Sequence, residues 1–290
     1  MRKRYSFSSR RTGRIGNIKK QRQKYPNLAE KIVEISDIVL ELLDARFFQE
    51  TRNLGVEELV KKRGKKIIYV VNKVDLIDNL KKQEIKQSLK PVVLVSCKER
   101  KGVAELRDFI KLIAKRVERK ENKIFKKSKV VKEESDKVKV GIIGYPNTGK
   151  SSLLNLLIGR ASLGVGSEAG FTKGIQKIKL SKDIVLLDSP GVIPKEHYSN
   201  SEVLKIANQT IFGGRSYNQI KEPDIAVQNL MLKFPNVLER TYKIEANGDS
   251  EILLNELGKR KGFLKKGGFV NEDQTARFVI KDWQEGKIEI

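Results

Sequence analysis

The sequence predicts an α/β fold in which a mostly parallel sheet, with helices on both faces, is followed by a small, mainly helical region. Three observations support this prediction. Short apolar runs alternate with helical patterns up to about residue 200, a glycine-rich turn directly follows one of these runs, and the pattern beyond residue 200 is helical with glycine-containing turns. The 290 residues, 39% of them hydrophobic, suffice for about two domains with a buried core.

The apolar runs have the length of buried strands. We expect strands at 37–43, 67–71, 92–95, 138–143, 175–180 and 184–187. We expect helices near 77–89, 103–117 and 150–159, and then at 202–208, 224–233, 251–257 and 274–283. The chain is therefore predicted to consist of a basic arm at 1–24, an α/β domain at 25–200 with an internal charged linker at about 119–137, and a helical domain at 201–290.

Charge and composition exclude several classes of protein. The chain has 60 Lys and Arg against 36 Asp and Glu, a net charge of +24, and residues 1–24 contain 10 basic residues and no acidic one. The single cysteine, Cys97, excludes an internal disulfide, and the single histidine, His197, excludes a classical zinc cluster. There is no apolar run long enough to span a bilayer and no signal-peptide pattern at the start. We expect a cytoplasmic monomer whose partner is a polyanion.

The strongest motif is the octapeptide GYPNTGKS, from Gly144 to Ser151, which lies between an expected strand and an expected helix. It fits G-x-x-x-x-G-K-[ST], a loop whose backbone N–H groups wrap around phosphate. Lys150 is expected to contact the β- and γ-phosphates, and the Ser151 hydroxyl to bind Mg²⁺. A second motif, D-S-P-G, starts at Asp188 after another strand. Asp188 would hold Mg²⁺ through water, and the Gly191 N–H would meet the γ-phosphate.

Two further motifs, N-K-V-D at 72–75 and S-C-K at 96–98, each follow an expected strand and indicate recognition of guanine. Asp75 can accept hydrogen bonds from both N1–H and the 2-amino group of guanine, which adenine cannot donate. Asn72 is expected to brace the loop, while the stems of Lys73 and Lys98 cover the two faces of the base. Cys97 is interpreted as a small residue of this loop without a redox role.

The order of the motifs predicts a circularly permuted Ras-like P-loop GTPase domain. In ordinary small GTPases the phosphate loop comes first, whereas here both guanine motifs precede it. Such a permutation is tolerable because domain termini usually lie close together, and the linker at 119–137 can join the original ends. The chain that leaves the D-S-P-G motif then enters the helical domain, so the state of the nucleotide can reposition that domain directly.

The sequence resembles the circularly permuted GTPases of the YlqF/RbgA type, which act in assembly of the large ribosomal subunit. The resemblance rests on D-A-R at 44–46, the guanine and phosphate motifs, G-F-T-K at 170–173, and K-G-G, D-W and G-K near the C-terminus. It implies GTP hydrolysis with Mg²⁺, binding to the large subunit through ribosomal RNA and ribosomal proteins, and potassium activation through Asn147.

The predicted site residues form two groups. Residues expected to contact GTP or GDP are Asn72, Lys73, Asp75, Ser96, Cys97, Lys98, Asn147, Thr148, Gly149, Lys150, Ser151, Ser152, Thr172 and Gly191. Residues expected to hold metal are Ser151, Thr172 and Asp188 for Mg²⁺, and Asn147 for K⁺. Thr172 is the candidate switch threonine, which would be ordered only in the triphosphate state.

The catalytic residue is not evident from the sequence. Val192 occupies the position at which Ras-like enzymes carry a glutamine that orients water, and it cannot replace that function. The remaining candidates are Thr172 and His197, so we expect slow intrinsic hydrolysis that RNA, ribosomal protein or K⁺ accelerates. An RNA-binding scaffold that senses guanine nucleotide with negligible hydrolysis is the alternative. A GTPase of membrane surfaces is disfavoured because the basic arm has few large apolar residues.

Overall fold

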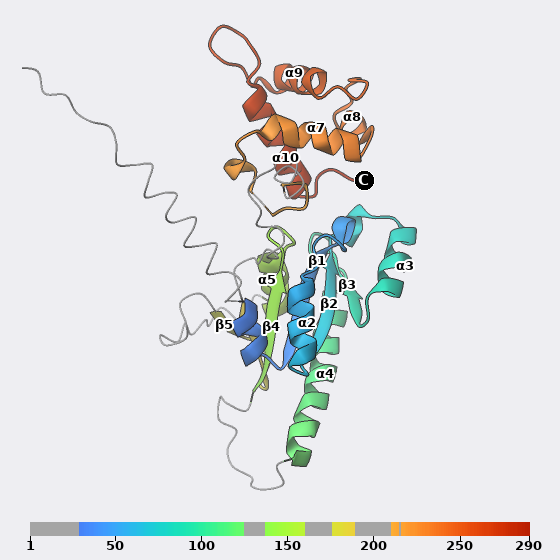
Figure 1. Ribbon diagram of the computed structural model, residues 1–290, viewed down its shortest axis with the longest axis vertical. Coiled ribbons are helices and arrows are strands. Elements are labelled where there is room, and N and C mark those ends of the chain that lie inside the picture. The colour runs from blue at the N-terminus through green and yellow to red at the C-terminus, as the bar shows by residue number, and fades with distance from the viewer. Residues whose placement is uncertain (1–28, 125–136, 160–175, 189–209, 215) are drawn as a thin grey trace, which may run out of the picture.

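The computed structural model of the chain describes residues 29–124, 137–159, 176–188, 210–214 and 216–290 (Figure 1). Its six-stranded sheet has the order β3-β2-β1-β4-β6-β5, in which all neighbours are parallel except β5 and β6. The strands are β1 (Ile38–Asp44), β2 (Lys66–Asn72), β3 (Val92–Leu94), β4 (Val138–Gly144), β5 (Gln176–Lys179) and β6 (Ile184–Asp188). All six predicted strands are confirmed, and each end that differs does so by one residue.

Helices cover both faces of the sheet, as predicted. Helices α4 (Val103–Ile124) and α5 (Lys150–Ile158) pack on the face to which Ile38, Leu40 and Leu42 of β1 point. A helix at residues 29–35 and α2 (Leu54–Lys62) pack on the opposite face, against Val39. Successive side chains of a strand point to opposite faces. Strand β1 is buried along its whole length because it lies between two layers of helices.

The structure corrects the predicted helices in four places. Helix α4 continues to Ile124, so residues 119–124 are helical and the linker begins later than predicted; this segment is rich in good helix formers. The helix at 29–35, α2 and α8 (Val237–Tyr242) were not predicted. In α2, only Val56 and Val60 are buried, which is too weak an apolar pattern to detect. The basic arm, the helix predicted at 202–208 and the predicted domain boundary lie outside the described residues.

The C-terminal helices form a core of their own above the carboxyl ends of the strands (Figure 1). They are α7 (Pro223–Lys233), α8, α9 (Ser250–Lys261) and α10 (Glu272–Gln284). The indole of Trp283 is fully buried in this core, and Phe47, from the turn after β1, packs 5.8 Å from it between ring centroids. The helical core is thus continuous with the loop that follows β1. No helix in the described part of the chain is both long and apolar enough to cross a bilayer.

The parallel register brings several strand ends to one edge of the sheet. Asp44, at the end of β1, lies beside Asn72 at the end of β2, and Leu42 lies beside Gly144 at the end of β4. On the other side of β4, Ile142 pairs with Asp188, the last residue of β6. Residues from motifs far apart in the sequence are therefore neighbours at this edge.

Candidate functional site

The loops after β2, β3 and β4 border one cavity of about 470 Å³ at the carboxyl edge of the sheet. Its lining residues are Asn72, Lys73, Asp75, Leu76, Cys97, Lys98, Asn147, Gly149, Lys150, Ser151, Ser152, Gln284, Glu285 and Gly286. The two guanine motifs and the phosphate motif thus meet around a single space. Parallel α/β sheets commonly bind ligands at this edge, outside the carboxyl ends of the strands.

The loop between β4 and α5 has a backbone shape that requires glycine at two positions. Gly149, at the N-cap of α5, has a φ of +98°, which L-residues rarely adopt. At Gly144, a Cβ atom would lie 2.6 Å from the carbonyl oxygen of Leu42 on the neighbouring strand. The Thr148 hydroxyl donates to the Tyr145 carbonyl over 2.8 Å and closes the loop. The first turn of α5 therefore presents its backbone N–H groups, which favour an anion, to the cavity.

Lys150 supplies a cation at the start of α5. Its ammonium lies 3.3 Å from the Gly144 carbonyl oxygen, folded back over the loop. Burial lowers the pKa of Lys150 to about 8, although the carboxylate of Asp188 acts in the opposite direction. A bound phosphate would favour the charged form still more strongly, since an opposite charge nearby raises the pKa of an amine.

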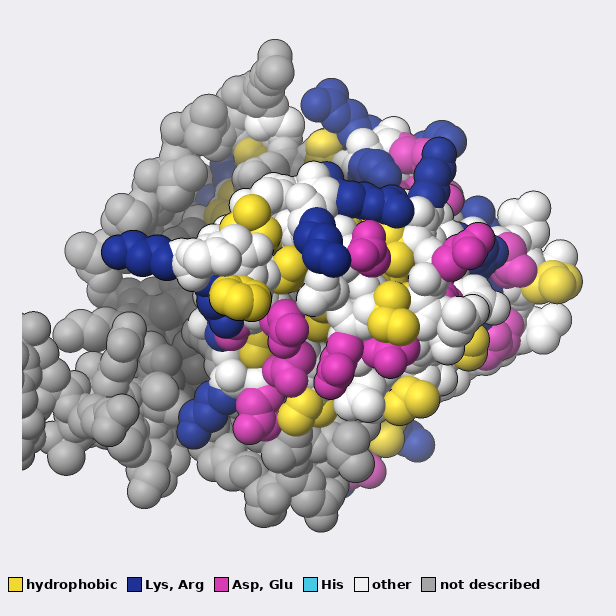
Figure 2. All heavy atoms as spheres, turned by 90° about the horizontal axis from the view of Figure 1, so that it is seen from above, with side chains coloured by type: hydrophobic (Ala, Val, Ile, Leu, Met, Phe, Trp, Pro, Cys, Tyr) yellow, Lys and Arg dark blue, Asp and Glu magenta, His cyan; other side chains and the backbone are white. Residues whose placement is uncertain are grey.

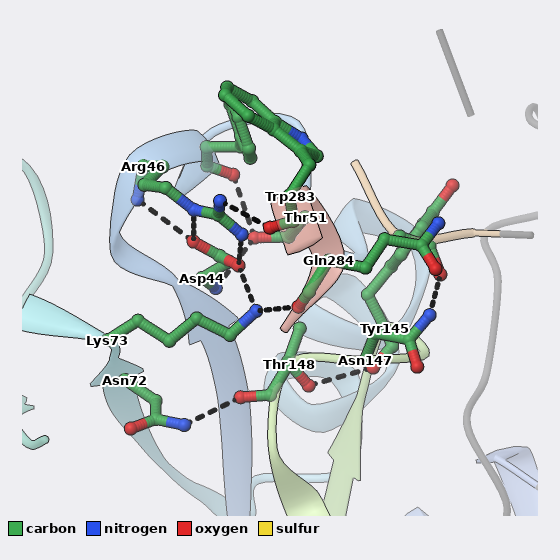
Figure 3. A network of polar contacts seen from close by, with 12 residues as sticks. Asp44, Arg46, Thr51, Asn72, Lys73, Tyr145, Asn147, Thr148, Trp283 and Gln284 are labelled. Carbon is green, nitrogen blue, oxygen red and sulfur yellow. Dashed lines mark hydrogen bonds and ion pairs between the residues drawn. The ribbon is translucent and has the colours of Figure 1, made fainter. Parts of the chain in front are cut away.

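Asn72 connects the three loops to one another. Its side-chain nitrogen donates to the Thr148 carbonyl over 2.8 Å (Figure 3). Its side-chain oxygen accepts from the Cys97 N–H over 3.0 Å. The Ser96 hydroxyl in turn donates to the Asp75 carboxylate over 2.6 Å. Burial raises the pKa of the Cys97 thiol to about 11, so it stays neutral at physiological pH. The geometry makes Asn72 a brace, whereas Asp75 and Lys98 line the cavity.

The structure separates the predicted site residues into four sets. Most of them line the cavity, but Ser96 and Thr148 are buried beside it and contribute through the hydrogen bonds described above. Asp188 ends β6 at the same edge, where its carboxylate and the Ser151 hydroxyl provide the hard oxygen donors that suit Mg²⁺. Thr172, Gly191, Val192 and His197 lie outside the described residues.

Four lining residues were missed by the sequence analysis. Leu76 directly follows Asp75, but Gln284, Glu285 and Gly286 come from the C-terminal end of α10. The sequence gives no local signal for this contact, because residue 284 is separated from the guanine motif by more than 200 positions. The sequence points to this region only through D-W at 282–283 and G-K at 286–287, two of the motifs on which the family resemblance rests.

Comparison with solved structures identifies the fold. The chain is similar to YlqF from T. maritima, crystallised with GNP, with a TM-score of 0.59 and 22% identity over 91% of this chain and 94% of that one. The chain has the circularly permuted GTPase fold of YlqF. The YlqF fold also accounts for the motif order, since the guanine loops follow β2 and β3 whereas the phosphate loop follows β4. A GDP-bound structure of the same protein matches with a TM-score of 0.57.

Sequence comparisons agree with the YlqF fold. A family model described as 50S ribosome-binding GTPase matches residues 139–244. The GTP-binding protein MJ1464 of Methanocaldococcus jannaschii is 34% identical over 90% of this chain, and the nuclear GTP-binding protein NUG1 of Saccharomyces cerevisiae is 29% identical over 93%. The chain spans 65% and 56% of the length of these two proteins, less than two thirds of either.

Nucleotide binding should be accompanied by proton uptake at Lys150. Because its pKa lies at about 8 in the free protein, much of the amine is neutral at about pH 8.5, and a bound phosphate would recharge it. Affinity for GDP should therefore decrease as the pH rises through about 8. Calorimetric titration with GDP in two buffers of different ionisation enthalpy measures the protons taken up. Lys150→Arg, whose guanidinium stays charged, should abolish this uptake, and equal uptake by both proteins would contradict the assignment.

Proposed function

We propose that this protein is a GTP-binding and GTP-hydrolysing switch that acts in assembly of the large ribosomal subunit by binding ribosomal RNA. The observation that carries the proposal is the convergence of base-reading and phosphate-binding loops around one cavity. Similarity to proteins named as GTP-binding proteins and to a family described as ribosome-binding GTPases supports it. We further propose that residues 1–24 and 201–290 form the ribosome-binding parts on either side of the GTPase domain.

In this proposal, guanine is recognised at the end of β2. Asp75 accepts from N1–H and from the 2-amino group, and its orientation is supported by the hydroxyl of Ser96, 2.6 Å away. Lys98, which is exposed at the rim of the cavity, covers one face of the base. The bridge that Asn72 makes to the phosphate loop keeps the two halves of the site at a fixed separation.

The phosphates are held at the start of α5. The backbone of residues 144–150 surrounds them, Lys150 neutralises charge on the β- and γ-phosphates, and Ser151 with Asp188 provides oxygen donors for Mg²⁺. Held by Ser151 and Asp188, Mg²⁺ would supply positive charge that offsets the negative charge developing during phosphoryl transfer. Thr172 and Gly191 complete the contacts to the γ-phosphate, and Asn147 is the candidate potassium residue.

Hydrolysis is expected to be slow without a partner. Val192 occupies the position of the water-orienting glutamine. The remaining catalytic candidates, Thr172 and His197, are supported by their sequence positions alone. If the ribosomal particle positions these residues, the rate of GTP hydrolysis will depend on the particle. Valine in place of glutamine at position 192 also favours the second candidate function, a nucleotide-sensing scaffold on RNA with negligible hydrolysis.

A basic surface in the C-terminal helices is suited to an RNA backbone. Figure 2, which looks down on these helices, shows Lys and Arg side chains gathered apart from a group of acidic ones. Exposed basic residues follow one another at the end of α9 and in the next turn: Lys259, Arg260, Lys261, Lys265 and Lys266. Phosphate contacts of this kind contribute affinity that decreases steeply with salt.

Asp75→Asn should change the preferred base from guanine to xanthine. The substitution replaces an acceptor with a donor opposite the purine 2-position, so GDP affinity should decrease by about tenfold or more while XDP affinity increases. Competition with a fluorescent nucleotide measures both. Asp78→Asn is the matched control, because Asp78 caps the neighbouring helix α3 (Asn79–Ser88) and asparagine caps equally well. Unchanged GDP affinity in Asp75→Asn would refute the base-reading assignment.

Purified large ribosomal subunits should accelerate GTP turnover by about tenfold or more. The physical reason is that Val192 stands where Ras-like enzymes carry the glutamine that orients water, so the particle would have to supply or position that group. Release of phosphate is measured with and without particles at matched salt, in K⁺ and again in Na⁺. Binding to particles without acceleration, in either salt, would favour the scaffold function over the hydrolysing switch.

The pair Lys265→Gln and Lys266→Gln should weaken binding to ribosomal RNA uniformly across sequences. Removing up to two phosphate contacts should reduce the slope of log affinity against log salt by up to about 2. The matched control is Lys61→Gln with Lys62→Gln, two exposed lysines in the last turn of α2, which remove the same charge elsewhere. If both pairs change the slope equally, the C-terminal surface is not the docking site.

A further inference from the structure

The C-terminal end of α10 borders the same cavity as the guanine motif. Gln284, Glu285 and Gly286 line it together with Lys73 and Asp75. Gly286 has a φ of +72°, and a Cβ atom at this position would lie 2.9 Å from the Leu76 side chain and 3.9 Å from the Lys73 stem. A side chain at 286 would displace the Leu76 methyl group, so glycine favours this close approach of the backbone to the guanine loop.

A buried ionic network ties this end of α10 to the guanine loop (Figure 3). The Asp44 carboxylate accepts from Arg46 Nε and Nη2, over 3.0 and 2.9 Å, and forms an ion pair with Lys73 Nζ over 2.8 Å. Each cation also donates to a carbonyl at the end of α10. Arg46 Nη1 reaches Trp283 O over 2.9 Å, and Lys73 Nζ reaches Gln284 O over 3.2 Å. Both carbonyls belong to the last turn of α10, where a helix leaves carbonyls to be satisfied by other donors; Trp283 O also accepts from the Gly286 N–H over 3.2 Å.

The network is almost completely shielded from water, so its geometry is strongly constrained. The side chains of Asp44 and Arg46 are 5% and 2% exposed. Burial alone would raise the pKa of Asp44, but Arg46 and Lys73 outweigh it and hold the pKa well below its usual value. Burial also lowers the pKa of Lys73, against the attraction of Asp44. Removing Asp44 would leave two cations without their carboxylate, and removing either cation would deprive the carboxylate and a helix-end carbonyl of a donor.

The same end of α10 is also connected to the phosphate side of the cavity. Trp283 Nε1 donates to the Ile211 carbonyl over 2.9 Å, and Gln284 Nε2 donates to the Thr210 carbonyl over 3.0 Å. Two residues further along, the Gly213 carbonyl accepts from Asn147 Nδ2 of the phosphate loop over 3.0 Å. The helical region therefore contacts both the loop that would read the base and the loop that would hold the phosphates.

We propose that residues 284–286 form a third wall of the guanine site, and that Asp44 and Arg46 are positioning residues that hold this wall against the Lys73 loop. This inference rests on the proposed binding of guanine nucleotide and adds residues to that site. The contacts between residues 284–286 and the Lys73 loop both hold α10 in place and shape the nucleotide site. Nucleotide binding and docking of α10 therefore stabilise each other. The coupling is reciprocal, so a partner that moves α10 changes nucleotide affinity by the same factor.

The first experiment compares Gly286→Ala with Gly268→Ala in the full chain. Both substitutions place alanine at a positive φ, +72° and +82°, but a Cβ atom at 268 has nothing within 4 Å. We expect Gly286→Ala to weaken GDP binding by about tenfold and Gly268→Ala to change it by less than about twofold. Fluorescence titration with labelled GDP measures both. If Gly286→Ala binds GDP as tightly as Gly268→Ala does, residues 284–286 are not a wall of the site.

The second experiment tests positioning with Arg46→Lys against Arg52→Lys. Arg52 is a more exposed control with similar contacts: it reaches Glu57 through two bonds of 2.7 Å and lies 5.9 Å from the Tyr69 ring centroid, entirely within the α/β part. Arg46→Lys should reduce the ratio of the affinity for GDP to the affinity for inosine diphosphate (IDP) by about threefold or more. The reason is that IDP lacks the 2-amino group that Asp75 would read. Arg52→Lys should leave this ratio unchanged. A purely structural role of Arg46 would lower thermal stability without altering the ratio.

The outcomes separate this inference from the function on which it rests. A wild-type chain that binds no guanine nucleotide would refute the proposed function itself. Tight GDP binding by the wild type, with an unchanged GDP to IDP ratio in Arg46→Lys, would refute only the positioning role. If Arg46→Lys does not fold, the glycine pair still decides whether residues 284–286 form the wall, since position 286 lies two residues beyond α10 and its substitution leaves the buried charges intact.

Discussion

Strand β1 pairs in parallel with β2 on one side and with β4 on the other, in a register that places Asp44 beside Asn72 and Leu42 beside Gly144. This pairing sets the distance between the guanine motif and the phosphate loop. The hydrogen bond from Asn72 to the Thr148 carbonyl then fixes it. The glycine at 144 is required because the Leu42 carbonyl on β1 approaches so closely. The shape of the site therefore depends on strand pairing and not on the order of the motifs along the chain.

Strand pairing explains why a permuted order can retain the site. Apart from Glu41 and Asp44, the buried residues of β1 and β4 are apolar or glycine, so the sheet gains its stability mainly from side-chain burial that does not depend on where the chain is cut. What the permutation changes is the attachment of the helical region, which follows β6 in the sequence and lies over the carboxyl edge. That placement brings the end of α10 to the rim of the cavity.

The positive charges of the chain have two distinct structural roles. Arg46 is buried and Lys73 is partly buried; both share the Asp44 carboxylate and donate to carbonyls at the end of α10, so these two charges are used inside the protein. The lysines at the end of α9 and in the following turn are exposed to solvent. Only the second kind can neutralise an external polyanion. The net charge of +24 therefore describes mainly the surface available to a partner and not the nucleotide site.

The sequence alone determined the strands, the sheet type and the residues of the three loops. It could do so because their signals are local: an apolar run, a glycine at a forced backbone angle, and a polar motif directly after a strand. Helices α2 and α8 escaped prediction because each is short and buries few side chains. Only the tertiary structure placed Arg46 under Trp283, with its guanidinium 5.0 Å from the ring centroid, and Gly286 against Leu76. These contacts join residues more than 200 positions apart, and no local pattern specifies them, because they arise from the packing of one folded region on another.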